Sequence, residues 1–406
     1  MTPPRRRTRM LSVASGSLLL AVLVWFNYSA VLPRVVADWG LSGLRAGVVF
    51  GAFQAGYLLA VVPAGMVADR RSPRHVIAAG AATAGVASLA FAGLADGFLV
   101  GTALRFVAGV GMAGVYVPGM RFVTAWYPPE ERGRAMGIYV GTYSLSAGLS
   151  FLVASAVATR LGWRTAVAAT SAGALFVPLL VLGVGRDAPG AGDDDTGFDL
   201  GVLRNRAYLA AVGVYSFHNW ELFGMRNWIV AYLVAATAVG ELAAPEATAG
   251  TVAGAVILLG GLGNVLGGSL SDRFGRRRVV GAALLTSGAL SATLGLAGGL
   301  PLPALLVLVG VYGVALTMDS APTSTAVTEI VDDDRVGTAL SVQSLVGFTT
   351  TVASPIAFGA ALDAAGYGLA FPTLAAGAAV ALVSLAALSR LAPAPEAATG
   401  DDPADA

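Results

Sequence analysis

One apolar segment near the middle of the chain carries the side chains best suited to bind or move a charge. Segment 207–235 contains His218 and Glu221, three residues apart, followed by Arg226. Residues three apart lie on the same face of a helix. A carboxylate in apolar surroundings needs a proton or a positive partner, so this pair predicts a proton carrier or a substrate ligand. The alternatives are a structural pair of Glu221 with His218 or an arginine, and an Arg226 that only reaches the interface.

Two other apolar segments each contain one ionisable residue. Arg105 lies within 98–118, and Asp319 lies within 302–325. Either side chain can serve a substrate or a proton, or can instead tie its helix to a neighbouring carbonyl or carboxylate. Two arginines at such depth favour an organic anion over a cation as the solute.

Amide and aromatic side chains complete the polar set within the apolar segments. Polar groups are costly at bilayer depth, so we expect them to line a central, water-filled cavity. The tryptophans and one tyrosine could stack on a substrate, with packing between helices as the alternative. The expected lining consists of Trp25, Asn27, Tyr28, Gln54, Tyr57, Tyr143, Trp220, Asn264 and Gln343.

A charged turn occurs twice, and its two copies are 203 residues apart. A repeat at this period indicates two similar halves. Asp69 and Asp272 can each cap a neighbouring helix or pair with an arginine of the same turn, which would close one side in one state. The alternative is that the arginines only anchor the topology. The expected gating residues are Gly65, Asp69, Arg70 and Arg74 in the first copy, and Gly268, Asp272, Arg273, Gly275, Arg276 and Arg277 in the second.

The composition is that of an integral membrane protein. Of the 406 residues, 56% are hydrophobic and 12% are charged, and none is cysteine. A soluble core could not enclose this much apolar surface. Apolar runs of about 20 residues predict membrane helices, because backbone polar groups in lipid must be paired within the protein. Twelve spans are predicted, at 11–32, 45–67, 75–94, 98–118, 135–158, 164–185, 207–235, 247–268, 279–298, 302–325, 337–361 and 368–390.

The predicted fold is all-α, with the twelve spans in two pseudo-symmetric six-helix bundles. Spans three, six, nine and twelve carry no charge beyond their ends, so we expect them to face lipid. Gly263 and Gly267, four residues apart, predict a close contact between helices. The expected parts are an N-terminal bundle at 1–185, a cytoplasmic linker at 186–206, a C-terminal bundle at 207–392 and a disordered cytoplasmic tail at 393–406.

The distribution of arginine predicts the orientation. The chain has no lysine, and most of its arginines lie in alternate loops on the side that also holds both termini. Loops rich in arginine face the cytoplasm. We therefore expect a multi-pass protein of the plasma membrane with both termini in the cytoplasm.

The doubled turn resembles the loop pattern of the major facilitator superfamily, G-x-x-x-D-R-x-G-R-R. The second copy is complete, whereas the first has Ser72 and Pro73 at the glycine and basic positions. Further similarity lies in the fourth span at Arg105, Gly109, Gly111 and Ala113, in the loop 128–137, and in the turn at Gly162, Trp163 and Arg164. The similarity covers nearly the whole chain.

The resemblance implies a secondary active transporter that moves a small solute by alternating access, with Arg105 serving proton coupling or substrate charge. No nucleotide motif is present, so a gradient, expected to be of protons, drives it. The expected partners are the lipid bilayer, a small-molecule substrate and protons, with no enzyme activity, cofactor, metal, nucleic acid or obligate protein partner. Alternatives are a drug or metabolite efflux antiporter, which the lack of proline in 135–158 disfavours, and a non-transporting receptor on the same fold.

Overall fold

The long apolar runs of the sequence form helices. The computed structural model describes residues 4–188, 200–332 and 335–391, and within these ranges there is no β-strand. Helices satisfy their own backbone polar groups, as a lipid environment requires. The predicted all-α membrane class is confirmed. Part of the predicted linker, 189–199, and the predicted tail, 393–406, lie outside the described residues.

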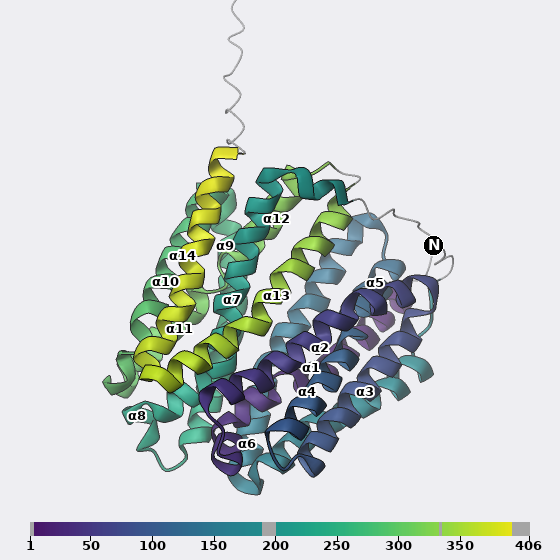
Figure 1. The fold of residues 1–406 in the computed structure, drawn as a ribbon. Coiled ribbons are helices and arrows are strands. Elements are labelled where there is room, and N and C mark those ends of the chain that lie inside the picture. The colour runs from purple at the N-terminus through teal and green to yellow at the C-terminus, as the bar shows by residue number, and fades with distance from the viewer. Residues whose placement is uncertain (1–3, 189–199, 333–334, 392–406) are drawn as a thin grey trace, which may run out of the picture.

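The helices follow one another through short connections (Figure 1). The first half contains α1 (Pro4–Trp39), α2 (Gly43–Arg70), α3 (Pro73–Leu94), α4 (Phe98–Ala113), α5 (Tyr116–Trp126) and α6 (Pro129–Gly183). The second half contains η1 (Leu200–Arg204), α7 (Arg206–Ala235), α8 (Thr237–Gly240), α9 (Pro245–Phe274), α10 (Arg276–Leu294), η2 (Ala297–Gly299), α11 (Leu302–Ala315), α12 (Ser320–Ile330), α13 (Val336–Ala365) and α14 (Tyr367–Leu391).

Nine helical stretches in the described ranges are long and apolar enough to cross a membrane. One of them, α6, contains two predicted spans, because the chain turns at Gly162, whose φ of 83° favours glycine. The other two predicted spans are α7, which contains His218, Glu221 and Arg226, and α10, which begins with three arginines. Together these make the twelve crossings that the sequence predicts. The fourth and tenth crossings are each interrupted by a turn, which was not predicted.

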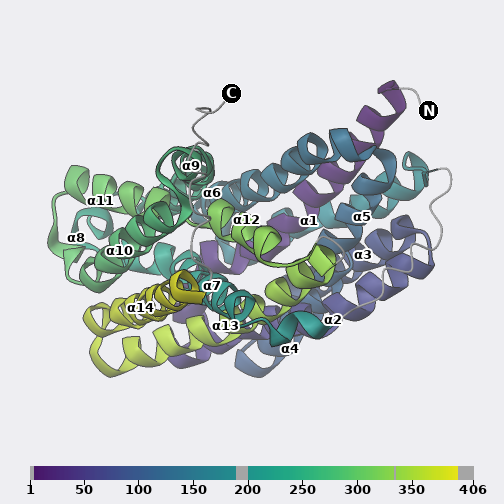
Figure 2. The same ribbon diagram turned by 90° about the horizontal axis from the view of Figure 1, so that it is seen from above.

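The helices pack as two groups. Helices α1 to α6 pack mainly against one another, and helices α7 to α14 do the same. Figure 1 shows the first group in purple to blue and the second in teal to yellow, and the view from above (Figure 2) shows them side by side. The groups meet chiefly where α2 packs on α13 and α6 packs on α9, with α1 beside α7. A site between the groups therefore receives side chains from both.

Glycines allow α2 and α13 to touch backbone to backbone. Gly43, Gly47 and Gly51 recur every four residues along α2 and lie against the stretch 352–359 of α13. A methyl group at any of the three would overlap backbone atoms of α13. Small residues four apart are the usual means by which membrane helices approach closely.

Similar contacts join other helices. Gly148 of α6 and Gly254 of α9 each lie against the other helix, which joins the two groups a second time. The predicted contact at Gly263 and Gly267 is confirmed, because Gly263 lies against the backbone of α11 at Val314 and Gly267 lies against the backbone of the following turn at Met318.

The two groups are packed together toward one side of the membrane. We call the side with the turns 65–74 and 268–277 the motif side, and the other the opposite side. The glycine contacts that join the groups lie in the half nearer the opposite side. Toward the motif side, Gly65 of α2, Gly137 of α6 and Gly268 of α9 have open space where a side chain would project.

Replacing Gly47 with leucine is expected to separate α2 from α13, because the new side chain would overlap the backbone of α13. The chain has no cysteine, so spin labels can be placed at Leu161→Cys and Leu296→Cys, two exposed positions in different groups on the opposite side. Pulsed electron paramagnetic resonance should give a longer mean distance between the labels in the variant. The control Gly93→Leu fills open space and should leave the distance unchanged. An unchanged distance in Gly47→Leu would contradict the expectation.

Candidate functional site

Arg226 of α7 is enclosed between the two groups without a partner. The residue is 7% exposed and makes no hydrogen bond or ion pair with any residue in the described ranges. It interacts electrostatically with the hydroxyl of Tyr143, which belongs to α6 in the other group. A guanidinium has five N–H donors and no acceptor. Those donors remain available to an anionic ligand.

Tyr143, which interacts with Arg226, is one of four tyrosines whose hydroxyls converge. Tyr57 of α2, Tyr116 of α5, Tyr143 of α6 and Tyr215 of α7 are close enough for every pair of them to interact electrostatically. We call these four residues the tyrosine cluster. The hydroxyls from α2, α5 and α6 have no hydrogen bond within the described part of the chain. One guanidinium with several free hydroxyls suits a small anion that carries carboxylate or sulfonate oxygens.

Aromatic rings surround the tyrosine cluster. The ring of Trp25 lies 5.0 Å from that of Tyr57 and 5.6 Å from that of Tyr143, measured between centroids. Phe348 of α13 lies 5.5 Å from Tyr57, so both groups of helices contribute rings. These distances are those of favourable aromatic contacts. The rings form an apolar wall beside the polar hydroxyls.

His218 and Asp319 form a buried contact between α7 and the turn before α12. The Nδ1 atom of His218 lies 2.8 Å from Oδ1 of Asp319, and its Nε2 atom lies 3.0 Å from Oγ of Ser320. Neither carboxylate oxygen of Asp319 receives a well-directed hydrogen bond from a described residue. The two side chains are therefore in close contact without a well-directed hydrogen bond, and both Asp319 oxygens remain available as acceptors.

Glu221 has different partners from those predicted. Its carboxylate accepts hydrogen bonds from Ser291 Oγ at 2.7 Å and Ser287 Oγ at 2.9 Å, both on α10. The hydroxyl of Tyr312 on α11 lies 2.5 Å from Ser291 Oγ. Glu221 is fully buried inside the second group. In this conformation α10 presents two hydroxyls one turn apart to Glu221, which forms no hydrogen bond or ion pair with His218, and its role in a proton or substrate pathway stays a prediction.

Arg105 of α4 is bonded to the backbone of α1. Its guanidinium donates to the carbonyls of Val24 and Trp25 at 3.0 and 3.1 Å, and to Asn27 Oδ1 at 3.3 Å. It also lies over the ring of Phe53, 4.4 Å from the centroid. These partners all belong to the first group. In this conformation Arg105 ties two helices together, which is the structural alternative that the sequence left open.

Asn27 occupies a position in the first group like that of Glu221 in the second. Its amide nitrogen donates to Ser88 Oγ of α3 at 3.3 Å and to two further hydroxyls of α6. Ser88 and Ser291 are 203 residues apart, the same separation as the two charged turns. The internal repeat therefore extends to the buried polar contacts. Asn27 lies inside its group, so its prediction as a cavity residue is wrong.

The remaining predicted lining residues differ in their surroundings. Trp220 donates from Nε1 to the carbonyl of Thr373 at 2.9 Å and packs on α14, so its placement in the cavity is wrong. Tyr28 is buried against two phenylalanines within the first group. Gln54 and Gln343 are buried, and each has one amide atom without a described partner. Asn264 is half-buried.

The first charged turn is fastened to α5 and to the segment that follows α6. Asp69 pairs with Arg121 of α5, and Arg74 pairs with Asp187 at 2.8 Å. Burial opposes ionisation of Asp187, but hydrogen bonds from Arg74 and Ser72 and the charge of Arg74 outweigh it and hold the pKa of that carboxyl below its usual value. The prediction that Asp69 caps a helix or pairs within its own turn is wrong, because α5 brings an arginine beside it.

The second charged turn is fastened through a different residue. Arg276 pairs with Glu329 of α12. Asp272 is exposed and makes no ion pair with any other described residue, so the predicted contact at Asp272 is not formed in this conformation. Gly275 has a φ of 85° and separates α9 from α10, a conformation that favours glycine.

A carboxylate does cap a helix, but on the opposite side. Asp363 of α13 accepts hydrogen bonds from the backbone N–H groups of Gly43 at 2.6 Å and Leu44 at 2.8 Å, the first residues of α2. A negative charge is stabilising at a helix N-terminus. Arg34 of α1 and Glu246 of α9 also pair across the two groups, at 3.5 Å. Asp363 was not predicted, and its only signal was an aspartate at the end of an apolar span.

Membrane-spanning helices in two groups, with unpaired polar side chains between the groups, define a membrane transport protein. The chain belongs to the Major Facilitator Superfamily, whose family model matches residues 14–239 and again residues 220–404. The family resemblance predicted from the sequence is confirmed.

Curated relatives and solved structures agree with this assignment. A probable sulfoacetate transporter of Cupriavidus necator is 28% identical over 317 residues, which cover 73% of this chain and 71% of the relative. A D-galactonate transporter of Escherichia coli is 30% identical over 150 residues, which cover 37% of this chain and 34% of the relative. The structure of a bacterial homologue of the human lysosomal transporter Spinster has the same fold, with a TM-score of 0.80 over 96% of this chain and 97% of that one, at 18% identity.

Replacing Ser291 with alanine is expected to destabilise the protein by about 1–3 kcal/mol, because the buried Glu221 carboxylate loses a hydrogen bond. The measurement is thermal or denaturant unfolding of the purified protein in detergent. Ser384→Ala is the matched control, since that hydroxyl is bonded only to a carbonyl of its own helix. Equal free energies of unfolding in the two variants would show that the hydrogen bond from Ser291 to Glu221 does not stabilise the protein.

Proposed function

We propose that the protein is a secondary active transporter of a small organic anion, which it moves by alternating access between the two groups of helices. The observation that supports this most is the enclosed, unpaired Arg226 beside the tyrosine cluster. An enclosed charge without a partner is unfavourable, so an anion is the expected occupant of the site. Sulfoacetate and galactonate, named for two relatives, are both small carboxylates.

Protons drive the transport through His218 and Asp319 in this proposal. The contact lies on α7 eight residues from Arg226, about 12 Å along the helix. A proton on Asp319 would cancel its charge and weaken its hold on His218, which would free α7 to move relative to α12. Glu221, which the sequence also nominated, holds α7 to α10 instead.

The motif side is proposed to be the cytoplasmic side, because its turns carry the clustered arginines. On this assignment both termini are cytoplasmic, the membrane is the plasma membrane, and the described conformation is closed toward the outside. Residues 1–185 and 207–392 act as the two moving halves, joined by the linker 186–206. The hydrogen bonds from the N-terminus of α2 to Asp363 break when the outer side opens.

Arg226→Gln is expected to weaken binding of the transported anion about 10-fold to 100-fold, because charge-assisted hydrogen bonds to the ligand are lost. Isothermal titration of the purified protein with sulfoacetate and with D-galactonate measures this. Arg226→Lys should recover part of the affinity, since it keeps the charge but loses the planar fork. Arg160→Gln, at an exposed position, is the control. Unaltered binding in Arg226→Gln would exclude Arg226 from the site.

Asp319→Asn is expected to abolish accumulation of substrate against its gradient while exchange of substrate across the membrane continues. The physical reason is that an amide cannot take up and release the coupling proton. Proteoliposomes with an imposed pH gradient measure accumulation, and counterflow at equal pH measures exchange. Glu221→Gln is the matched control and should still accumulate substrate per folded molecule. Accumulation by Asp319→Asn at the parent level would remove that residue from the coupling mechanism.

A further inference from the structure

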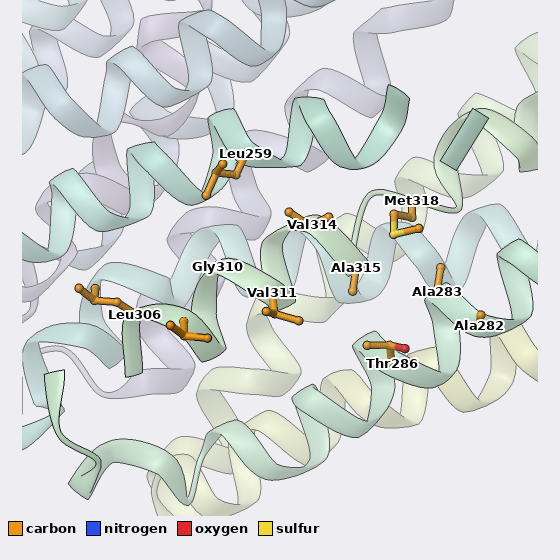
Figure 3. Close-up of a pocket in the computed structure, with 11 residues that line it drawn as sticks. Leu259, Ala282, Ala283, Thr286, Leu306, Gly310, Val311, Val314, Ala315 and Met318 are labelled. Atoms are coloured by element: carbon orange, nitrogen blue, oxygen red, sulfur yellow. The ribbon is translucent and has the colours of Figure 1, made fainter. Parts of the chain in front are cut away.

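An apolar groove lies on the surface of the second group, away from the tyrosine cluster. It is formed by α9, α10 and α11 and has a volume of about 670 Å³. Figure 3 shows Leu306 at one end of the groove and Met318 with Ala282 at the other. The stretch of α11 from Leu306 to Ala315 is about 14 Å long, close to half of the hydrocarbon thickness of about 30 Å. Because α11 begins on the opposite side at Leu302, Leu306 lies near that side, and the groove extends from there past the middle of the membrane to Ala282 and Met318 in the motif-side half.

Small residues keep this groove open. Gly310 faces it from α11, and no atom lies within 4 Å of the position where its side chain would begin. Ala282 and Ala283 of α10 form the facing wall. Larger side chains at these positions would fill the space.

A free positive charge stands at the motif-side end of the groove. Arg278, Ala282 and Thr286 follow one another every four residues on α10, so they share one helix face. The last two line the groove, and Arg278 precedes them by one turn, about 6 Å. Arg278 is exposed and has no ion pair or hydrogen bond with any other described residue. The motif-side end of the apolar groove thus lies one helical turn from an unpaired guanidinium.

We infer that this groove binds an anionic phospholipid of the motif-side leaflet, with the phosphate at Arg278 and an acyl chain that runs along α10 past Ala282 and Thr286 toward Gly310. Basic residues beside an apolar pocket between membrane helices are the chemistry that recognises anionic lipid headgroups. The lipid fills the space between α10 and α11 that Gly310 leaves open. This site is separate from the proposed anion site at Arg226.

The test uses the purified full-length chain, freed of phospholipid in a neutral detergent. Dioleoyl phosphatidylglycerol and dioleoyl phosphatidylcholine are titrated separately, and bound lipid is counted by native mass spectrometry. We expect tighter binding of phosphatidylglycerol. Arg278→Gln should weaken that binding about fivefold, since one arginine near a membrane surface contributes about 1 kcal/mol. Arg277→Gln is the matched control, because Arg277 lies on the neighbouring face of α10, and it should keep the parent affinity.

A second pair of variants tests the groove itself. Gly310→Leu should reduce binding of phosphatidylglycerol, whereas Gly93→Leu, in open space on α3, should not. Equal binding of the two lipids, equal losses in the two arginine variants, or equally tight binding of glycerol 3-phosphate alone would overturn the inference. Because the readout is lipid binding, failure of the proposed transport function would leave this result unaffected.

Discussion

The absence of water in a bilayer core obliges each polar side chain there to find its partner within the protein. Most buried polar groups of this chain meet that condition. The carboxylate of Glu221 is held by two serines, and the guanidinium of Arg105 is held by carbonyls of α1. Arg226 and Asp319 are the exceptions among the described arginine, histidine and acidic residues inside the spans. The unsatisfied charged groups, and not the polar groups as a whole, mark the candidate site.

The fold was predictable because its determinants are local in sequence. Apolar runs of membrane length predict the spans, and the doubled charged turn predicts two similar halves. The spacing of Gly263 and Gly267 predicts a close contact between helices. The turns within the fourth and tenth crossings were not predictable, because contacts with other helices produce them. Thr317, for example, lies in the second of these turns and donates to a carbonyl of α9 at 2.7 Å. The sequence around Thr317 does not indicate that its hydroxyl bonds to α9.

The candidate site was predictable in its residue types and not in its pairings. His218 and Glu221 share a helix face by spacing, yet one contacts α12 and the other α10. Which hydroxyl or carboxylate lies opposite a side chain depends on the rotation of helices far away in sequence. The same limit applies to Asp363, whose partner at Gly43 is 320 residues distant. An aspartate at a span end does not reveal which helix it caps.

The hydrogen-bond network around Glu221 joins helices that are synthesised at different times. Ribosomes deliver α7 to the membrane before α10 and α11, whose serines and tyrosine complete the network. Until then the Glu221 carboxylate of α7 lacks these hydrogen-bond donors. By composition, α7 is one of the two crossings that are not apolar enough to be recognised as a membrane span. The hydrogen bonds that satisfy Glu221 therefore come from a helix synthesised later. The network around this carboxylate can form only after α10 has been made.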